Sequence, residues 1–456
     1  MTLTEIREAQ QAYFAAGNTI PLKNRRQYLT ALLQEIKNRE KEICRALHED
    51  LRKSEFEART TETSIVLDEI AAFLKNLNSY AKPRSVRVSM LNFPAKGLLY
   101  PEPYGKVLIF SAWNYPFQLM MSPFAGAIAA GNCAILKPAE QAPATADVIE
   151  KIISEVFPAG HAAVCRGGHE MTRELLSEEF DYLFYTGGPA GAKIIMKAAA
   201  EHLTPLTLEL GGKSPCFVDS DAKLDLAAKR IVWGKYLNAG QTCVAPDYVL
   251  AHKAVRNELV ERLKYWIHRF YGEDPFTSED YPRIINRRHC ERLAALMNGS
   301  EILCGGTVNL EENYIAPTLL APLEKDAPVM QEEIFGPLLP ILEVASPDEA
   351  IEFIRKRPKP LALYYFSDTR KNLNRILSET SSGGVAVNET ITHLINPEMP
   401  FGGVGASGFG AYHGKKTFDT FTHEKPVMIK SNRIDLPMRY PPNLNKNLKI
   451  LDLISK

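Results

Sequence analysis

The fold is decided by residues 106–138, which read KVLIFSAWNYPFQLMMSPFAGAIAAGNCAILKP. Between Lys106 and Lys137 this stretch carries no charge, and it is long enough to span a lipid bilayer. Polar and helix-breaking residues interrupt it at Asn114, Pro116, Gln118, Pro123 and Gly131–Asn132. Because each polar break would cost free energy in lipid, we interpret the stretch as a buried strand, a loop, a short helix and a second buried strand.

The same alternation continues toward the carboxyl terminus. Short β-rich runs follow at 162–168 (AAVCRGG), 181–188 (DYLFYTGG) and 204–212 (TPLTLELGG), and helical patterns separate them. Strands that alternate with helices are typical of a parallel sheet covered on both faces. A second α/β region runs from about 211 to 425, so the sequence predicts an α/β protein.

The flanking regions follow other patterns. Residues 1–77 repeat apolar residues at helical spacing, whereas about 82–104 reads as extended segments broken by Pro and Gly. The tail after Lys425 carries Pro residues and is expected to form an extended arm.

The composition excludes several classes of function. The 456 residues contain 54 Lys and Arg against 54 Asp and Glu, so no excess charge favours nucleic acid or an anionic membrane surface. The seven cysteines are scattered and never spaced as CxxC, which argues against a disulfide framework and a structural zinc site. We therefore expect no metal and a reducing, cytoplasmic location. No secretory signal and no membrane anchor are expected, because neither end carries a long apolar segment.

Cys243 is the first candidate for chemistry. It lies in NAGQTCVAPD (238–247), in a Gly-Gln-Thr-Cys turn directly after a helical pattern. A cysteine becomes a nucleophile where its thiolate is accessible and stabilised, for instance by backbone N–H groups. Taken alone, the segment fits a small buried side chain better, since most free cysteines are of that kind.

Two polar residues at expected strand ends could serve the same reaction. Glu209, in LELGGKS (208–214), ends an apolar strand at the edge where α/β proteins bind ligands, and it could take a proton from water. Asn114, in SAWNYPF (111–117), could donate to a developing oxyanion. In isolation, structural pairing of Glu209 and turn formation by Asn114 explain the two residues at least as well.

A glycine-rich turn provides a fourth element. The segment YTGGPAGAKI (185–194) reads as strand, turn and helix, and the amino terminus of a helix can hold a pyrophosphate. It is not GxGxxG, so by itself it is a weak signal. Together the four elements match aldehyde oxidation through a thioester, which requires a cysteine nucleophile, an oxyanion donor, a water-activating carboxylate and a dinucleotide cradle.

Over nearly its whole length the sequence resembles the aldehyde dehydrogenase superfamily, most closely the class 3 branch of fatty and aromatic aldehyde dehydrogenases. The resemblance rests on long ordered segments, among them LTLELGGKSP, WGKYLNAGQTCVAPDY, QEEIFGP and MPFGGVGASGFGAYHGK. It implies NAD(P)-dependent oxidation of medium- or long-chain aliphatic or aromatic aldehydes to carboxylic acids. It also implies an aldehyde dehydrogenase-like fold with a Rossmann-type NAD(P)-binding domain (1–81 and 105–208), an α/β catalytic domain (209–425) and a small β bridging and oligomerisation element (82–104 and 426–456).

The resemblance assigns catalytic roles residue by residue. Cys243 matches the family nucleophile, and its own backbone N–H and the Asn114 side chain match the oxyanion donors. Glu209 matches the general base that activates water. Glu333, in EEIFGP, is the second candidate for a base and also matches the residue that holds the nicotinamide ribose.

Cofactor contacts are implied in the same way. Lys137 and Glu140 match residues that meet the adenosine ribose, and Phe335 matches a residue beside the nicotinamide ring. The glycine turn departs from the family pattern, because Ala192 replaces its second glycine and Pro189 removes an N–H. NAD is expected at least as readily as NADP, since an acidic Glu140 repels a 2′-phosphate. The residues expected to cradle the pyrophosphate are Thr186, Gly187, Gly188 and Gly191.

Alternative functions remain open at this point. A cysteine esterase or acyltransferase would use Cys243 without hydride transfer, and an acylating dehydrogenase would pass the thioester to coenzyme A but generally lacks the strand-end glutamate. A non-catalytic protein that has kept the fold is a third reading. The short amino terminus, as in class 3 relatives, predicts a homodimer. Tyr115 and residues 388–396 are expected near the substrate, and Trp113, Trp233 and Trp266 are expected in the core.

Overall fold

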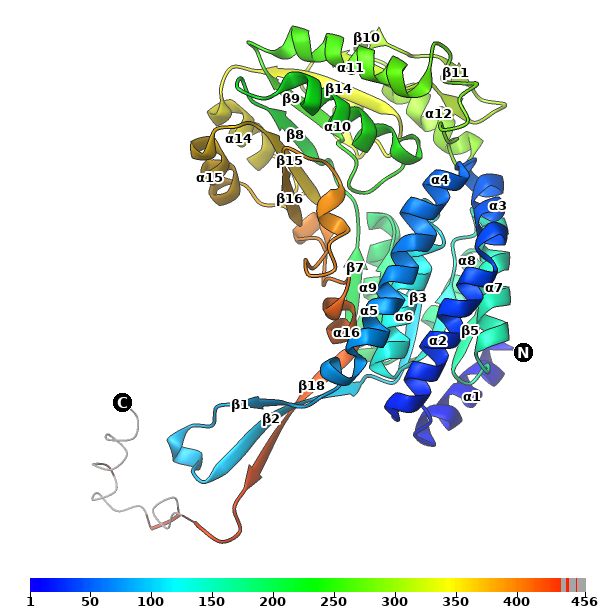
Figure 1. Cartoon of the computed structure of the whole chain (residues 1–456), viewed down its shortest axis with the longest axis vertical. Helices are drawn as coiled ribbons and strands as arrows, with labels where there is room; N and C mark the ends of the chain where they lie inside the picture. Colours follow the sequence, from blue (N-terminus) through cyan, green and yellow to red (C-terminus); the bar gives the residue numbers. More distant parts are fainter. Residues whose placement is uncertain (436–439, 443–447, 449–456) are drawn as a thin grey trace.

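The computed structural model describes residues 1–435, 440–442 and 448. This part of the chain contains four sheets, of which the smallest is the antiparallel pair β11 (Val308–Asn309) and β12 (Tyr314–Ile315). Figure 1 shows the three larger sheets one above the other. The predicted strand, loop, helix and strand of 106–138 are confirmed as β3 (Lys106–Phe110), α6 (Gln118–Ala130) and β4 (Cys133–Lys137). Both strands are apolar because the sheet is covered on both faces, and α6 is buried along its whole length.

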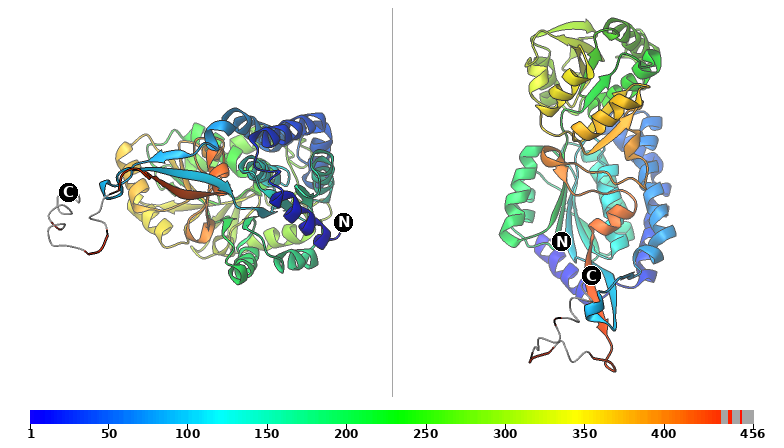
Figure 2. Two further views of the ribbon diagram at one scale, coloured as in Figure 1. Left: turned by 90° about the horizontal axis from the view of Figure 1, so that it is seen from below. Right: turned by 90° about the vertical axis from the view of Figure 1, so that its left-hand side faces the viewer.

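The central sheet has six strands in the order β17-β7-β6-β3-β4-β5, all parallel except β17. Its remaining strands are β5 (Ala162–Val164), β6 (Tyr182–Thr186), β7 (Leu206–Glu209) and β17 (Gly408–Phe409). Helices cover both faces, as the right-hand view of Figure 2 shows. They are α1 (Leu3–Ala15), α2 (Leu22–Asn38), α3 (Glu40–Leu51), α4 (Glu55–Ala58), the π-helical turn η1 (Arg59–Thr63), α5 (Ser64–Tyr80), α7 (Pro143–Val156), α8 (His169–Leu176) and α9 (Pro189–His202).

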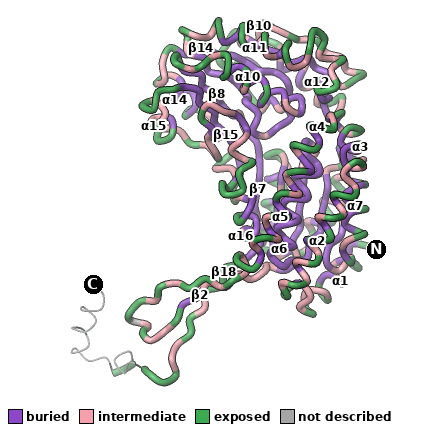
Figure 3. Tube along the Cα trace, viewed as in Figure 1, coloured by how far each residue is buried: buried purple, intermediate pink, exposed green. Residues whose placement is uncertain are grey.

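A second sheet of seven strands follows the order β10-β13-β14-β9-β8-β15-β16, with only β10 antiparallel to its neighbour. Its strands are β8 (Pro215–Val218), β9 (Tyr248–His252), β10 (Ser300–Cys304), β13 (Thr318–Pro322), β14 (Leu338–Val344), β15 (Ala362–Phe366) and β16 (Gly384–Val387). The associated helices are α10 (Leu224–Tyr236), the 3-10 turn η3 (Leu237–Gly240), α11 (Arg256–Tyr271), α12 (Arg287–Leu296), α13 (Pro328–Gln331), α14 (Pro347–Arg355) and α15 (Arg370–Glu379). Buried side chains from one face of the central sheet and from the second sheet form one large core, and the other face of the central sheet, with Leu108 and Ile135, contributes to a separate cluster. Figure 3 colours the buried residues purple along the chain.

The third sheet projects from the molecule. It has the order β1-β2-β18 and consists of β1 (Arg84–Val86), β2 (Ala95–Pro103) and β18 (Thr422–Lys430). Strands β2 and β18 pair antiparallel along nine residues, from Thr422 opposite Pro103 to Lys430 opposite Ala95. Most of β18 is exposed. Of the predicted arm 426–456, residues 436–439, 443–447 and 449–456 lie outside the described residues, and the division into three domains stays a prediction.

Candidate active site

Two cavities meet at Cys243. The first, which we call the aromatic cavity, has a volume of about 830 Å³, and Phe56, Trp233, Trp266, Phe270 and Tyr271 are among its walls. The second, the glycine-turn cavity, has a volume of about 580 Å³. Its walls include Thr186, Gly187 and Gly188. Leu119, Cys243, Phe401 and Tyr412 line both cavities, so the sulfur is reached from two sides.

The turn before Cys243 has an unusual backbone. Asn238, Ala239 and Gly240 follow one another with φ of 52°, 51° and 76°, in the left-handed region that costs free energy for the first two. The side chain of Gln241 compensates, because it donates to the Asn238 carbonyl at 3.0 Å and accepts from the Ile285 N–H at 2.9 Å. This bracing places Cys243 at the boundary of the two cavities.

The Cys243 thiol is neutral at rest. Burial raises its pKa to about 12, and the nearby carboxyls of Glu333 and Glu209 add to the increase. The backbone N–H groups of Cys243 and Val244 act in the opposite direction, because they favour a negative charge at this position. The thiolate therefore needs a base or an additional positive charge to form at neutral pH.

Asn114 lies in the loop after β3 and is held from three sides. Its backbone carbonyl accepts from Asn238 Nδ2 at 2.7 Å and from Lys53 Nζ at 2.9 Å. Its side-chain Nδ2 donates to the Gln241 carbonyl at 3.0 Å, which leaves its second N–H for another acceptor. Because Asn114 lines the glycine-turn cavity beside Cys243, that acceptor can be an oxygen on a group attached to the sulfur.

Glu209 ends β7 at the carboxyl edge of the central sheet. It lies opposite Gly408 of β17 and beside Thr186 of β6, and its side chain faces the glycine-turn cavity. Both carboxyl oxygens are buried without a hydrogen-bond partner in the described part of the chain. Burial raises the pKa of Glu209 well above its usual value, so the carboxyl must be in its ionised form before it can accept a proton from water.

Glu333 enters the same cavity from the second sheet. Its carboxyl lies against Gly211, where any side chain would overlap with it. Burial raises the pKa of Glu333 to about 8, and a hydrogen bond from the Gly212 backbone partly offsets the rise. Phe335, at φ 50°, packs its ring against the edge of Trp113 at 5.2 Å between centroids. Phe335 and Trp113 both line the cavity.

The expected cofactor residues do not all share this cavity. Thr186, Gly187 and Gly188 line it and precede the amino terminus of α9, whose cap has no side-chain hydrogen bond. Gly191 instead lies against the Tyr185 hydroxyl, so a side chain at position 191 would overlap with that hydroxyl. Lys137, at the end of β4, donates to the Pro138 carbonyl at 3.0 Å.

Glu140 lies close to Lys137 in sequence, also outside the glycine-turn cavity. Its carboxyl lies against Gly168. The structure thus brings Cys243, Glu209 and Asn114 together, and it leaves Lys137 and Glu140 along the same sheet edge.

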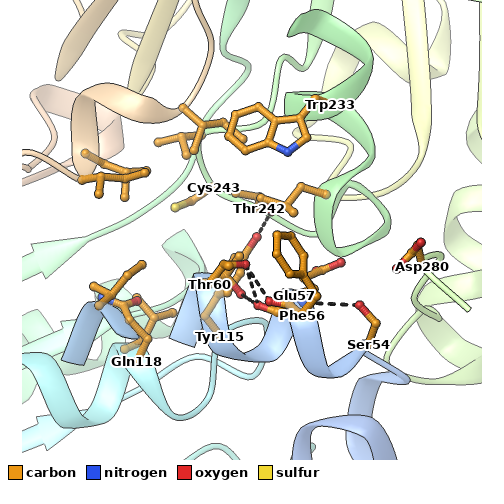
Figure 4. Close-up of a pocket in the computed structure, with 18 of the residues that line it drawn as sticks. Ser54, Phe56, Glu57, Thr60, Tyr115, Gln118, Trp233, Thr242, Cys243 and Asp280 are labelled. Carbon is orange, nitrogen blue, oxygen red and sulfur yellow. Dashed lines mark hydrogen bonds between the residues drawn. The ribbon is translucent and has the colours of Figure 1, made fainter. Parts of the chain in front are cut away.

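The aromatic cavity corrects one expectation and supplies new residues. The prediction of three core tryptophans is wrong for Trp233, which is 38% exposed, and for Trp113, which lines the glycine-turn cavity. Trp266 is half-buried and packs against the core, and it also lines the aromatic cavity. Tyr115 lines the aromatic cavity as expected, together with Ile391, Leu394 and Ile395 from the segment 388–396. Glu57 and Thr60, shown in Figure 4, were missed because short charged helical segments usually face solvent.

Comparisons with known proteins give matches over most of the chain. The sequence profile of the Aldehyde dehydrogenase family matches residues 3–427. Mouse aldehyde dehydrogenase family 3 member A2 is 49% identical over 94% of this chain and 89% of its own length. The 4,4'-diaponeurosporen-aldehyde dehydrogenase of Staphylococcus aureus is 47% identical over 96% and 95%. Mouse "aldehyde dehydrogenase, dimeric NADP-preferring" is 48% identical over 94% and 95%.

A solved structure shares the fold in full. The substrate-bound state of Staphylococcus aureus AldH superimposes with a TM-score of 0.98 at 45% identity, and the match covers 100% of both chains. The predicted fold class is therefore confirmed. Among the helices of the described residues, none is long and apolar enough to cross a membrane.

Proposed function

Because this chain belongs to the aldehyde dehydrogenase family and is an NAD(P)-dependent oxidoreductase acting on aldehydes, we propose that Cys243 carries the reaction as a covalent thioester. The position of Cys243 in the wall common to both cavities carries this proposal. An aldehyde in the aromatic cavity and a dinucleotide in the glycine-turn cavity would meet at the sulfur.

The glycine-turn cavity fits a nicotinamide dinucleotide. It combines a glycine pair before a helix amino terminus, the carboxyl of Glu333, and the buried Thr186 hydroxyl, which has no hydrogen-bond partner in the described part of the chain. The dinucleotide would be held there by Thr186, Gly187, Gly188, Glu333 and Phe335. Its adenosine end would contact Lys137 and Glu140. When bound, the oxidised dinucleotide accepts the hydride that the substrate loses.

The residues of this chain perform the remaining steps. The Cys243 thiol first gives its proton to a nearby carboxylate, for which Glu333 is the candidate, and the thiolate sulfur then attacks the aldehyde carbon, so that the carbonyl oxygen takes the negative charge. Asn114 Nδ2 and the Cys243 backbone N–H donate to that oxygen. Loss of hydride from the carbon leaves a thioester on Cys243. Glu209 then removes a proton from water, the water oxygen attacks the thioester carbon, and the acid leaves as the sulfur departs as thiolate.

We further propose medium- or long-chain aliphatic and aromatic aldehydes as substrates. The aromatic cavity has a volume of about 830 Å³, and its walls are mainly aromatic and aliphatic side chains, which favour apolar substrates by burial of their surface. Glu140 supports use of NAD at least as readily as NADP, because a carboxylate binds a ribose hydroxyl and repels a phosphate.

A homodimer in the cytoplasm completes the proposal. The projecting sheet exposes Tyr100, Met428 and Ile429, which a second copy could cover, and one relative is named dimeric. The cysteines are free, as a reducing compartment requires. Sedimentation at micromolar concentration as a monomer, or fractionation of the protein with membranes, would contradict these two statements.

One assay tests the function. Purified protein with NAD and a series of aldehydes from acetaldehyde through decanal to benzaldehyde should form NADH without coenzyme A, fastest with the longer or aromatic members. If neither NADH nor NADPH forms until coenzyme A is added, the acylating reaction is established instead. Hydrolysis of esters with no cofactor-dependent turnover of any aldehyde would leave only the esterase reading.

A further inference from the structure

A lysine outside both cavities holds the Asn114 segment. Lys53 follows α3, and its side chain is fully buried. Lys53 Nζ donates to Glu62 Oε1 at 2.6 Å and to the Asn114 carbonyl at 2.9 Å. The same ammonium lies 4.0 Å from the centre of the Tyr115 ring. Three partners therefore surround a group that has three N–H bonds.

The partner carboxylate fixes the far end of the same segment. Glu62 lies in the π-helical turn η1, and its Oε2 accepts from the N–H groups of Phe117 at 3.0 Å and Gln118 at 2.9 Å. These N–H groups open helix α6 and have no partner within the helix, and a negative charge is favourable there. The Lys53–Glu62 pair thus holds residues 114–118 at both ends.

The fold alone does not require an ion pair at this place. Removing two charges from water costs free energy that their attraction returns only in part, and apolar side chains of similar volume often replace such pairs without loss of stability. An apolar side chain could not donate to the Asn114 carbonyl. With Asn238 Nδ2 on the same oxygen, Lys53 occupies the second acceptor position and fixes the orientation of that peptide group.

We propose that Lys53 is a positioning residue for aldehyde oxidation, whose ammonium orients Asn114 so that its side-chain amide meets the carbonyl oxygen of the aldehyde. Tyr115, whose ring lies beside the ammonium, is held independently of Lys53, since its hydroxyl lies 2.6 Å from Thr242 Oγ1 (Figure 4). The inference rests on the proposed roles of Asn114 and Cys243. Lys53 itself lines neither cavity, so it acts through Asn114.

A double-mutant cycle tests the proposal. Lys53→Met, Asn114→Ala and the combined variant are compared by the rate of the first turnover, followed as the NADH burst, and by unfolding in urea. Lys53→Met should slow the burst about 10- to 100-fold in the otherwise native protein, as expected for a misplaced reacting group. In the Asn114→Ala background, Lys53→Met should slow the burst by about 2-fold or less, because the side-chain amide that Lys53 orients is absent. The loss of stability should be equal in both backgrounds.

Two further variants separate positioning from folding. Lys53→Met/Glu62→Gln removes both charges and keeps an acceptor for the α6 N–H groups, so it replaces Lys53→Met in the cycle if the single variant does not fold. Arg25→Met is the matched control, because Arg25 is a buried cation that donates to the Ala129 carbonyl at 3.2 Å, at the other end of α6. It should lower stability and leave the burst rate unchanged.

The burst rates separate the role of Lys53 from the role of Asn114. An equal loss of burst rate in both backgrounds, or no loss in the native background, overturns the role of Lys53. A normal burst in Asn114→Ala itself overturns the proposed role of Asn114, and the inference with it. Strong slowing by Lys53→Met that disappears in Asn114→Ala supports both.

Discussion

Replacement of Glu209 by glutamine is the most direct perturbation of the proposed reaction. The two side chains have the same shape, and neither carboxyl oxygen of Glu209 has a hydrogen-bond partner among the described residues, so the change breaks no contact of the fold. What is lost is the ability to accept a proton from water. A general base contributes about 10²- to 10⁴-fold, which corresponds to about 3–5 kcal/mol in the barrier of the hydrolytic step.

Rapid-mixing measurement of NADH tests this expectation. Glu209→Gln should release about one NADH per active site at the normal rate and then turn over 10²- to 10⁴-fold more slowly, because the thioester accumulates. Unchanged steady-state turnover would refute the assignment and transfer the role to Glu333. A slowed burst would also refute the assignment of Glu209 to hydrolysis, because it would show that Glu209 acts before the thioester forms.

The same variant has a stability signature. Burial raises the folded-state pKa of Glu209 well above its ordinary 4.5, so the folded protein retains a proton that the unfolded chain releases. The contribution of this group to stability is complete below the unfolded pKa and is lost as the pH rises toward the folded pKa. Glu209→Gln should therefore be more stable than the native protein at pH 8, and the difference should disappear near pH 4, as measured by urea unfolding.

Three further predictions concern neighbouring positions. Cys243→Ala should abolish turnover and leave dinucleotide affinity, measured by fluorescence titration, within about 2-fold, because the change removes one sulfur atom. Gly211→Ala should displace the Glu333 carboxyl and raise KM for NAD more than it lowers the burst rate; an unchanged KM would contradict the contact. Glu140→Gln should lower the ratio of kcat/KM for NAD over NADP by about 10-fold, since one like-charge repulsion of about 1.4 kcal/mol disappears, and a constant ratio would remove Glu140 from the cofactor site.

The central sheet and the meeting of Asn114 with Glu209 were predictable for a physical reason. The order of strands and helices determines a parallel sheet, and the carboxyl ends of parallel strands lie at one edge. Residues at strand ends such as Glu209 and Asn114 are therefore brought near one another even when a hundred residues separate them. The location of Cys243 followed from the resemblance, because its decapeptide alone did not distinguish a nucleophile from a buried filler.

The sequence pattern failed where tertiary contacts override local composition. Lys53 and Glu62 lie in KSEFEARTTET, a charged segment typical of a solvated helix face, yet both are fully buried because each is the other's partner. Trp233 shows the opposite case, since an apolar side chain at helical spacing lines an open cavity instead of the core. Neither arrangement is visible in hydropathy, which describes each residue without its distant neighbours.

Among the described residues, four side chains line both cavities, and this small overlap has a consequence for how such an enzyme changes over time. If the aromatic cavity holds the aldehyde as proposed, mutations in its outer walls, such as those at Phe56 or Trp233, should change the range of substrates without changing cofactor binding in the glycine-turn cavity. Selection, or an engineer, can therefore adjust substrate range and cofactor choice as nearly independent traits. Leu119, Phe401 and Tyr412, beside the sulfur, are where the two adjustments would interfere.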